Sequence, residues 1–314
     1  MVHHTSDGSR GVRSLAAALL LLTAGAVAPR SLAAQENQIF MSLVDRTGTP
    51  VTDLQRNEVQ VIEDGQPREV LRLESIDWPM KLTVLVDNGP AFESALLHIR
   101  NGLRGLFETL PAGIEIELLT LSPQPRWIVR PTRDHLALID GISRVAPDRA
   151  APKFIEGLME VAERISKDDS NYFPVVLIIG SDGVEGSAYV ERDVNQMANR
   201  LFQRATTMHV VMVGVGAGRS LSSNQLEVGI QMSNITGGRY ENINATSRLA
   251  TLLPEMGEQI ARSHRLQSQQ YRITYDASGI PVPRGEGLNR QAQVSASTTR
   301  QGLNGVLTFD GHIP

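Results

Sequence analysis

The sequence predicts an α/β protein in which a doubly wound, mostly parallel sheet is inserted into a small β domain made from the two flanks. Three observations carry this prediction. Strand-like apolar runs alternate with helical periodicities over residues 80–265. The run at 175–179 is almost entirely apolar, as in a central parallel strand that is covered on both faces. Short alternating runs lie on either side, at 38–78 and 268–314.

The first flank, residues 38–78, has the pattern of paired strands. Asp64 and Gly65 separate the apolar runs 59–63 and 70–73. Asp-Gly between two such runs is a strong hairpin signal, because a two-residue turn needs backbone angles that glycine tolerates. We therefore expect these two runs to pair with each other.

The central part, residues 80–265, alternates strands with helices. Strands are expected at 82–86, 114–121, 127–129, 175–179 and 210–213. Apolar residues three and four apart predict helices over 92–110, 136–142, 154–165, 194–202 and 249–260. Alternation of this kind implies right-handed crossovers and a parallel sheet with helices on both faces.

The second flank, residues 268–314, returns to strands. Tyr271, Ile273 and Tyr275 alternate, and later strands are expected near 293–298 and 306–309. Neither flank is long enough to be stable alone. We therefore expect the two flanks to pair into one small β domain, with the α/β domain inserted between them.

Residues 1–34 have the features of an export signal. Arg10 and Arg13 form a basic start, the run 15–28 is apolar and uncharged, and small residues precede a cleavage position near Gln35. The apolar run is shorter than the about 20 residues that a bilayer crossing needs. We expect a periplasmic or secreted mature chain without a membrane span. An uncleaved N-terminal anchor is the alternative.

Charge and cysteine content exclude several classes of function. The chain has a net charge of −4, and removal of the signal segment, which carries three arginines and one aspartate, makes it −6. An acidic mature chain argues against nucleic acid or anionic lipid as the main partner. The absence of cysteine excludes thiol catalysis, thiolate metal sites and disulfides.

Two aspartates follow predicted strands of the sheet. Asp87 follows the strand at 82–86, and Asp182 follows the central strand within Gly180-Ser181-Asp182-Gly183. Ligands of open parallel sheets gather at the carboxyl ends of the strands, near the point where the strand order reverses. Asp87 and Asp182 are therefore the candidate site residues. Capping of a following helix or loop is the alternative role for each.

Several separated segments resemble a von Willebrand factor A (VWA) domain. The resemblance covers about residues 80–265 and is carried by the segments 82–87, 175–183, 213–216 and 236–240. The flanks strengthen it, because the segments 45–51, 61–67 and 270–275 resemble an exported VWA-related family that is common in acidobacteria. The resemblance implies a doubly wound fold and a binding function.

VWA domains typically hold a divalent cation at a metal-ion-dependent adhesion site, which uses Asp-x-Ser-x-Ser, a threonine and a second aspartate. By this resemblance Asp87 and Asp182 are retained as metal ligands. Both serine positions are lost, to Gly89 and Ala91, and the threonine position falls near Pro152, which has no side-chain oxygen. Hard cations need oxygen ligands, so the site is predicted to be degenerate.

The leading hypothesis is a binding module that contacts a protein partner through loops near 87–94, 150–154 and 182–189, without a resident cofactor. The candidate partner-binding residues are Asn88, Glu93, Ser94, Ser181 and Glu185. The alternative is cation-dependent adhesion through Mg²⁺ or Ca²⁺, with Asn88, Glu93, Ser94 or Ser181 replacing the lost hydroxyls. A third hypothesis is an α/β hydrolase or nucleotide-binding enzyme. It is disfavoured because the chain has neither a Gly-x-Ser-x-Gly elbow nor a P-loop.

Overall fold

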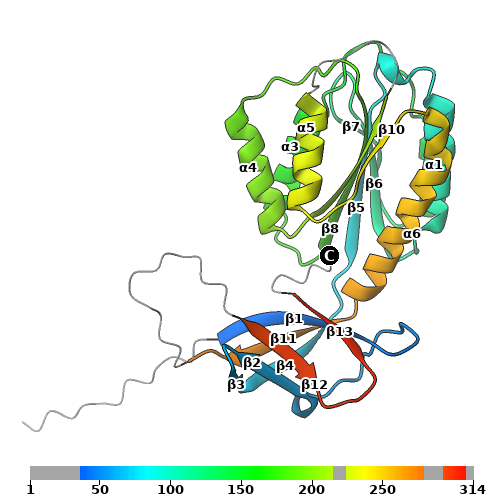
Figure 1. Cartoon of the computed structure of the whole chain (residues 1–314). Helices are drawn as coiled ribbons and strands as arrows, with labels where there is room; N and C mark the ends of the chain where they lie inside the picture. Colours follow the sequence, from blue (N-terminus) through cyan, green and yellow to red (C-terminus); the bar gives the residue numbers. More distant parts are fainter. Residues whose placement is uncertain (1–35, 215–223, 279–292, 309–314) are drawn as a thin grey trace, which may run out of the picture. The chain divides into compact units, whose positions relative to one another are not determined.

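The computed structural model describes residues 36–214, 224–278 and 293–308 (Figure 1). The predicted signal segment 1–34 lies outside the described residues. The same holds for residues 215 and 216, which end one of the VWA-like segments. The described chain forms an α/β domain and a β domain, and each is considered by itself below.

The α/β domain is built on a six-stranded sheet in the order β10-β9-β8-β5-β6-β7. Its strands are β5 (Met80–Val86), β6 (Glu115–Thr120), β7 (Arg126–Thr132), β8 (Phe173–Ser181), β9 (Thr207–Val213) and β10 (Tyr240–Ile243). All neighbours pair in parallel except β7, which pairs antiparallel with β6 at one edge. The strand order reverses between β5 and β8, as in a doubly wound fold.

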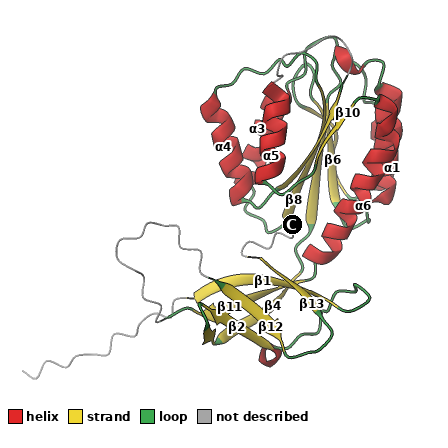
Figure 2. Cartoon of the chain, in the orientation of Figure 1, coloured by secondary structure: helices red, strands yellow, loops and turns green. Residues whose placement is uncertain are grey.

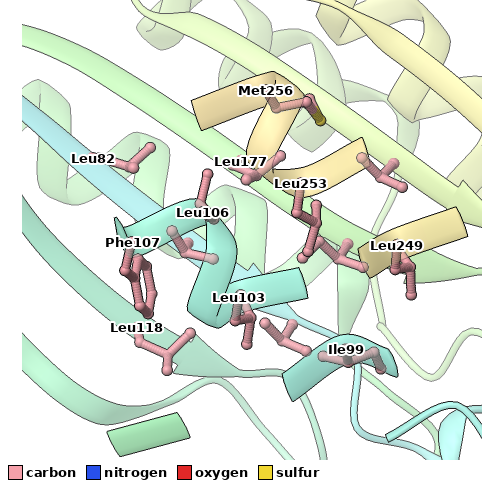
Figure 3. Close-up of a cluster of buried hydrophobic side chains, with 14 of the residues drawn as sticks. Leu82, Ile99, Leu103, Leu106, Phe107, Leu118, Leu177, Leu249, Leu253 and Met256 are labelled. Carbon is pink, nitrogen blue, oxygen red and sulfur yellow. The ribbon is translucent and has the colours of Figure 1, made fainter. Parts of the chain in front are cut away.

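Helices cover both faces of this sheet (Figure 2). On one face lie α1 (Leu96–Thr109), α2 (His135–Ser143) and α6 (Leu249–Gln267), and on the other lie α3 (Phe154–Lys167), α4 (Glu191–Gln203) and α5 (Asn224–Ile235). Apolar stripes on α1 and α6, such as Leu103, Leu106 and Leu253, meet Leu82, Leu118 and Leu177 of the strands (Figure 3). Each such fully buried side chain contributes about 1.5–3 kcal/mol, which fixes the helices on the sheet.

The β domain contains two antiparallel sheets that combine both flanks of the chain. The four-stranded sheet has the order β13-β1-β11-β4, and the three-stranded sheet has the order β12-β2-β3. The first flank supplies β1 (Glu36–Val44), β2 (Val59–Glu63), β3 (Gln66–Arg68) and β4 (Val70–Ile76), and the second supplies β11 (Gln270–Asp276), β12 (Val294–Thr298) and β13 (Asn304–Thr308). The predicted fold class, a doubly wound sheet inserted into a β domain from both flanks, is confirmed.

The sequence prediction was wrong about one strand pairing and missed two elements. The turn at Asp64-Gly65 forms, with positive φ at both residues, but it joins β2 to the short strand β3. The strand β4 pairs with β11 instead, because the chain leaves the hairpin after Arg68. Helix α5 and strand β10 were not predicted at all. Three short 3₁₀ turns also occur, at Arg56–Glu58, Pro90–Phe92 and Thr246–Arg248.

No helix in the described ranges has both the length and the apolar character that a bilayer crossing requires.

Candidate functional site

The candidate site lies at the carboxyl ends of β5, β8 and β9, on both sides of the point where the strand order reverses. Asp87 directly follows β5, and Asp182 directly follows β8. The segment before α3, which contains Pro152, reaches the same edge, because a Cβ atom on Gly89 would lie 2.8 Å from Pro152 Cδ. The fold therefore brings three separate stretches of the chain together, as expected for a switch point.

Asp87 is a buried carboxylate that accepts hydrogen bonds from the loop after β5 and from the end of β8. Its side chain is 1% exposed. Oδ1 accepts the backbone N–H of Gly89 at 2.7 Å, and Oδ2 accepts the hydroxyl of Ser181 at 2.7 Å and the backbone N–H of Ser181 at 3.2 Å. Burial raises the pKa of Asp87, against the opposing effect of these hydrogen bonds. The carboxylate thus ties the end of β8 to the loop that follows β5.

The positions of the missing hydroxyls are filled by packing. Besides its approach to Pro152, a Cβ atom on Gly89 would lie 3.2 Å from Asp87 Oδ1, so no side chain fits there without movement. A Cβ atom on Gly183 would lie 2.9 Å from Cβ of Ala91. Gly89 therefore packs against Pro152 beside Asp87, and Ala91 packs against Gly183. None of Gly89, Ala91 and Pro152 carries a side-chain oxygen of the kind that a divalent cation needs.

Asp182 directly follows β8 and lies beside the end of β9. Its backbone N–H donates to Val213 at 3.1 Å, and its Oδ2 is 3.7 Å from the point where a Cβ atom on Gly214 would stand, at the end of β9. Ser181, the residue before Asp182, donates its hydroxyl to the Asp87 carboxylate. In the described part of the chain, no three histidine, aspartate or glutamate side chains are grouped to hold a metal ion. Gly89, Ala91 and Pro152, at the positions where the resemblance expects hydroxyl ligands, have no side-chain oxygen.

Asn88 is a second buried polar residue of the site, and it connects three loops. Its Nδ2 donates to the carbonyl of Ala146 at 2.9 Å, and its Oδ1 accepts the backbone N–H of Ser122 at 2.9 Å. Its own carbonyl accepts the N–H of Asp148 at 2.7 Å. The Asn88 side chain therefore holds the loop after β6 and the segment before α3 against the loop after β5.

Glu185 caps helix α3 across the site. Its Oε1 accepts the backbone N–H groups of Phe154 at 2.9 Å and Ile155 at 3.3 Å, which are the first donors of α3. The same carboxylate accepts the hydroxyl and the N–H of Ser187 at 2.5 and 2.9 Å. A carboxylate at a helix N-terminus accepts hydrogen bonds from free N–H groups and interacts favourably with the positive end of the helix dipole. The loop after β8 is thereby fastened to α3.

Of the five predicted partner-binding residues, Glu93 and Ser94 are exposed, whereas Asn88 and Ser181 are buried and Glu185 is half-buried. The exposed surface of the loop after β8 is instead dominated by Val184, which is 76% exposed. Sequence reasoning did not single out Val184, although a valine in a polar loop was a usable signal.

A further residue missed from the sequence is Gln225, which is buried beneath the loop after β8. Its Nε2 donates to the carbonyls of Ser181 at 3.2 Å and Gly183 at 2.7 Å. Gln225 belongs to α5, so it had no predicted element to place it. Hydrogen bonds therefore join the loops of this edge beneath its exposed residues. They are made by Asp87, Asn88, Glu185 and Gln225.

No protein-family model matches the sequence, and the comparison with curated proteins gives no match. Solved structures with similar folds are found. The von Willebrand factor type A protein from Catenulispora acidiphila is 10% identical with a TM-score of 0.49, and the match covers 86% of this chain and 72% of that chain. The SpRpn10 VWA domain is 14% identical with a TM-score of 0.43, over 56% of this chain and 94% of that one.

Proximal thread matrix protein 1 from the mussel byssus, solved with a zinc-occupied MIDAS motif, is also similar. It is 10% identical with a TM-score of 0.46, and the match covers 65% of this chain and 49% of that chain. The doubly wound topology of the present chain is established by its own strand order.

Proposed function

We propose that this chain is an exported, non-enzymatic protein-interaction module of the VWA type. In this proposal the carboxyl edge of the six-stranded sheet contacts a protein partner without a bridging metal ion. The observation that carries the proposal is the packing around Asp87, where Pro152 lies against Gly89 and Ala91 lies against Gly183. Gly89, Ala91 and Pro152 offer no hydroxyl to a cation, which supports contact without a metal ion.

The proposed contact surface consists of Glu93, Ser94 and Val184, which are exposed on neighbouring loops. The buried residues beneath them have a supporting role. Asp87 and Asn88 join the loops by hydrogen bonds, and Glu185 fastens the loop that carries Val184 to α3. A pre-ordered surface loses less conformational entropy on binding than a mobile one, which favours recognition by this edge.

The same geometry argues against an enzyme. Ser181 and Asp87 form a hydroxyl–carboxylate pair at 2.7 Å, which is the kind of contact that activates a nucleophile. Both side chains are buried, however, and the second oxygen of Asp87 is engaged by the Gly89 N–H. A substrate therefore has no access to the pair, whose role in this proposal is structural.

A cation titration tests the metal-free part of the proposal. We expect Mg²⁺ and Ca²⁺ to leave the melting temperature of the purified chain unchanged. A cation present at 100 times its Kd would contribute about 2.7 kcal/mol, which corresponds to a rise of about 5–10 °C for a chain of this size. The measurement is differential scanning fluorimetry with each cation and with EDTA.

The positive control is the triple variant Gly89→Ser, Ala91→Ser, Pro152→Thr, which restores the three hydroxyls and removes the proline ring from Gly89. This variant is expected to gain a cation-dependent rise. A rise in the unaltered chain that disappears in Asp87→Ala would overturn the metal-free proposal and favour the cation-dependent alternative.

A capture experiment tests the proposed contact surface. The immobilised chain is incubated with the envelope fraction of the organism that exports it, and bound protein is quantified. We expect Glu93→Lys combined with Val184→Asp to reduce capture at least tenfold, because both exposed contacts are lost or reversed. EDTA is expected to have no effect.

The matched control is Leu136→Asp, which alters an equally exposed apolar residue on α2. Equal capture by the Glu93→Lys, Val184→Asp variant and by the unaltered chain would contradict the proposed surface. Loss of capture in EDTA would contradict metal-free contact.

A further inference from the structure

Helices α4 and α5 lie side by side on one face of the sheet (Figure 1). Residues of both helices line a groove of about 770 Å³. Val194 of α4 and Leu226 and Val228 of α5 line it, together with Tyr189 from the loop that leads into α4. This groove contains none of the residues assigned to the proposed contact edge. Its lining is largely apolar, so it offers a surface that water solvates poorly.

Exposed apolar side chains lie on α5 and just before α4, and one of them, Ile230, lines the groove. Val190 is 56% exposed and Ile230 is 43% exposed, and Ile235 on the last turn of α5 is 40% exposed. On the same helix Val228 and Met232 are buried against the sheet. Helix α5 therefore exposes Ile230 and Ile235 among polar residues on its outer side, in addition to its buried inner side. Exposed apolar side chains beside a groove mark a candidate interaction site.

Two acidic residues lie at the groove and give it a charge. Glu191 on α4 and Glu227 on α5 are both exposed and both line the groove, and its lining includes no lysine, arginine or histidine. Within residues 36–214, 224–278 and 293–308, neither carboxylate takes part in an ion pair. The groove thus combines an apolar floor with negative charge on each of its two walls.

We propose that the α4–α5 groove is a second interaction site, which docks a basic amphipathic segment of a protein partner. An amphipathic helix can lay its apolar stripe along a groove between two helices, with anchors three and four residues apart. Lysine or arginine beside that stripe would meet Glu191 and Glu227, which have no other cation to pair with in the described structure. A second copy of this surface is disfavoured as the occupant, since a two-fold pairing would oppose like charges.

The test uses model peptides, because the natural segment is unidentified. The probe is a fluorescein-labelled, 18-residue peptide of leucine and lysine with its leucines at helical spacing. Two comparison peptides have glutamate in place of lysine, or the same composition scrambled so that no apolar stripe forms. Binding to the full chain is measured by fluorescence anisotropy, with sedimentation velocity to report the oligomeric state.

We expect the leucine–lysine peptide to bind at least tenfold more tightly than either comparison peptide. Glu191→Lys combined with Glu227→Lys, and separately Ile230→Ser, are each expected to weaken its binding at least tenfold. The matched controls are Glu108→Lys combined with Asp140→Lys, and Leu136→Ser, which make the same kinds of change on α1 and α2 at the opposite face. These controls are expected to bind as the unaltered chain does.

The proposal is overturned if the groove variants and the control variants bind the peptide equally. It is also overturned if the scrambled peptide binds as tightly as the ordered one, because charge alone would then explain binding. A dimer of the chain that dissociates in Ile230→Ser would identify a second copy as the occupant and would equally overturn it. Each variant is first checked for an unchanged melting temperature, so that misfolding is not read as lost binding.

Discussion

Replacing Gly238 by alanine is expected to lower the free energy of unfolding by about 3 kcal/mol or more. A Cβ atom at this position would lie 1.8 Å from the carbonyl oxygen of Met208 and 2.4 Å from its carbonyl carbon. Backbone atoms of β9, which is paired on both sides, cannot move aside as a flexible side chain can. Close approach of the two backbones therefore explains the glycine here.

Hydrogen bonds hold the backbone around Gly238 in place, so this segment cannot shift away from Met208 without breaking them. The N–H of Gly238 donates to the carbonyl of Ser233 at 2.9 Å. In the next residue, Arg239, both the backbone N–H and the carbonyl form hydrogen bonds to β9. The Arg239 N–H donates to His209 Nδ1 at 3.0 Å, and its carbonyl accepts the Val210 N–H at 2.8 Å. Relief of the clash would break this set of hydrogen bonds.

The neighbouring glycine provides the matched control for this prediction. Gly237 has a φ of +66°, but nothing lies within 4 Å of its Cβ position. Gly237→Ala should therefore cost only the strain of a left-handed backbone, about 1–2 kcal/mol. Urea unfolding followed by circular dichroism measures both variants, and equal losses would show that backbone approach does not explain Gly238.

The sequence was informative wherever a single period extended along an element. The apolar run of β8 and the stripes of α1 and α6 predicted the sheet and its helices because each buries one consistent pattern. Helix α5 was not predicted because its apolar residues face both inward and outward, so they form no single stripe at helical spacing. The feature that hid α5 from the sequence is the one that supports its proposed docking role.

The sequence shows which hydroxyl-bearing residues the candidate site lacks, but it does not show how the residues of the site pack together. Absence of hydroxyls at positions 89, 91 and 152 can be read from the letters alone. That Pro152 lies against Gly89, and that Glu185 caps a helix 31 residues earlier in the chain, depends on contacts between distant segments. Periodicity describes single elements, so it carries no information about such contacts.

Replacing Arg164 by alanine is expected to cost about 3 kcal/mol at neutral pH. Arg164 on α3 binds Glu117 of β6 in bidentate fashion, with both N···O distances 2.9 Å, and the Glu117 side chain is almost fully buried. Removal of one partner from a buried ion pair leaves an uncompensated charge, which is strongly destabilising. The hydrogen bonds that Thr83 and Trp127 donate to Glu117 place the expected cost at the lower end of the usual range.

Arg130→Ala is the control, because the Arg130 guanidinium stacks on the same Trp127 ring as that of Arg164, at 4.8 and 4.9 Å. Loss of an exposed cation–π contact should cost less than about 1 kcal/mol. Similar losses for Arg130→Ala and Arg164→Ala would contradict the assignment of the large effect to the buried carboxylate. The measurement is again urea unfolding.

The Glu117–Arg164 pair should make the free energy of unfolding depend on pH in the acidic range. Burial raises the pKa of Glu117, but the hydrogen bonds from Arg164, Thr83 and Trp127 outweigh it and hold the pKa below its ordinary value of 4.5. The unfolded chain therefore binds a proton at Glu117 more readily than the folded chain does. Its stabilising contribution is fully present above pH 4.5 and is lost as the pH falls through the lower, folded value. Glu117→Gln, which cannot take up this proton, should flatten the acid side of the stability profile, whereas an unchanged slope would show that other carboxylates cause it.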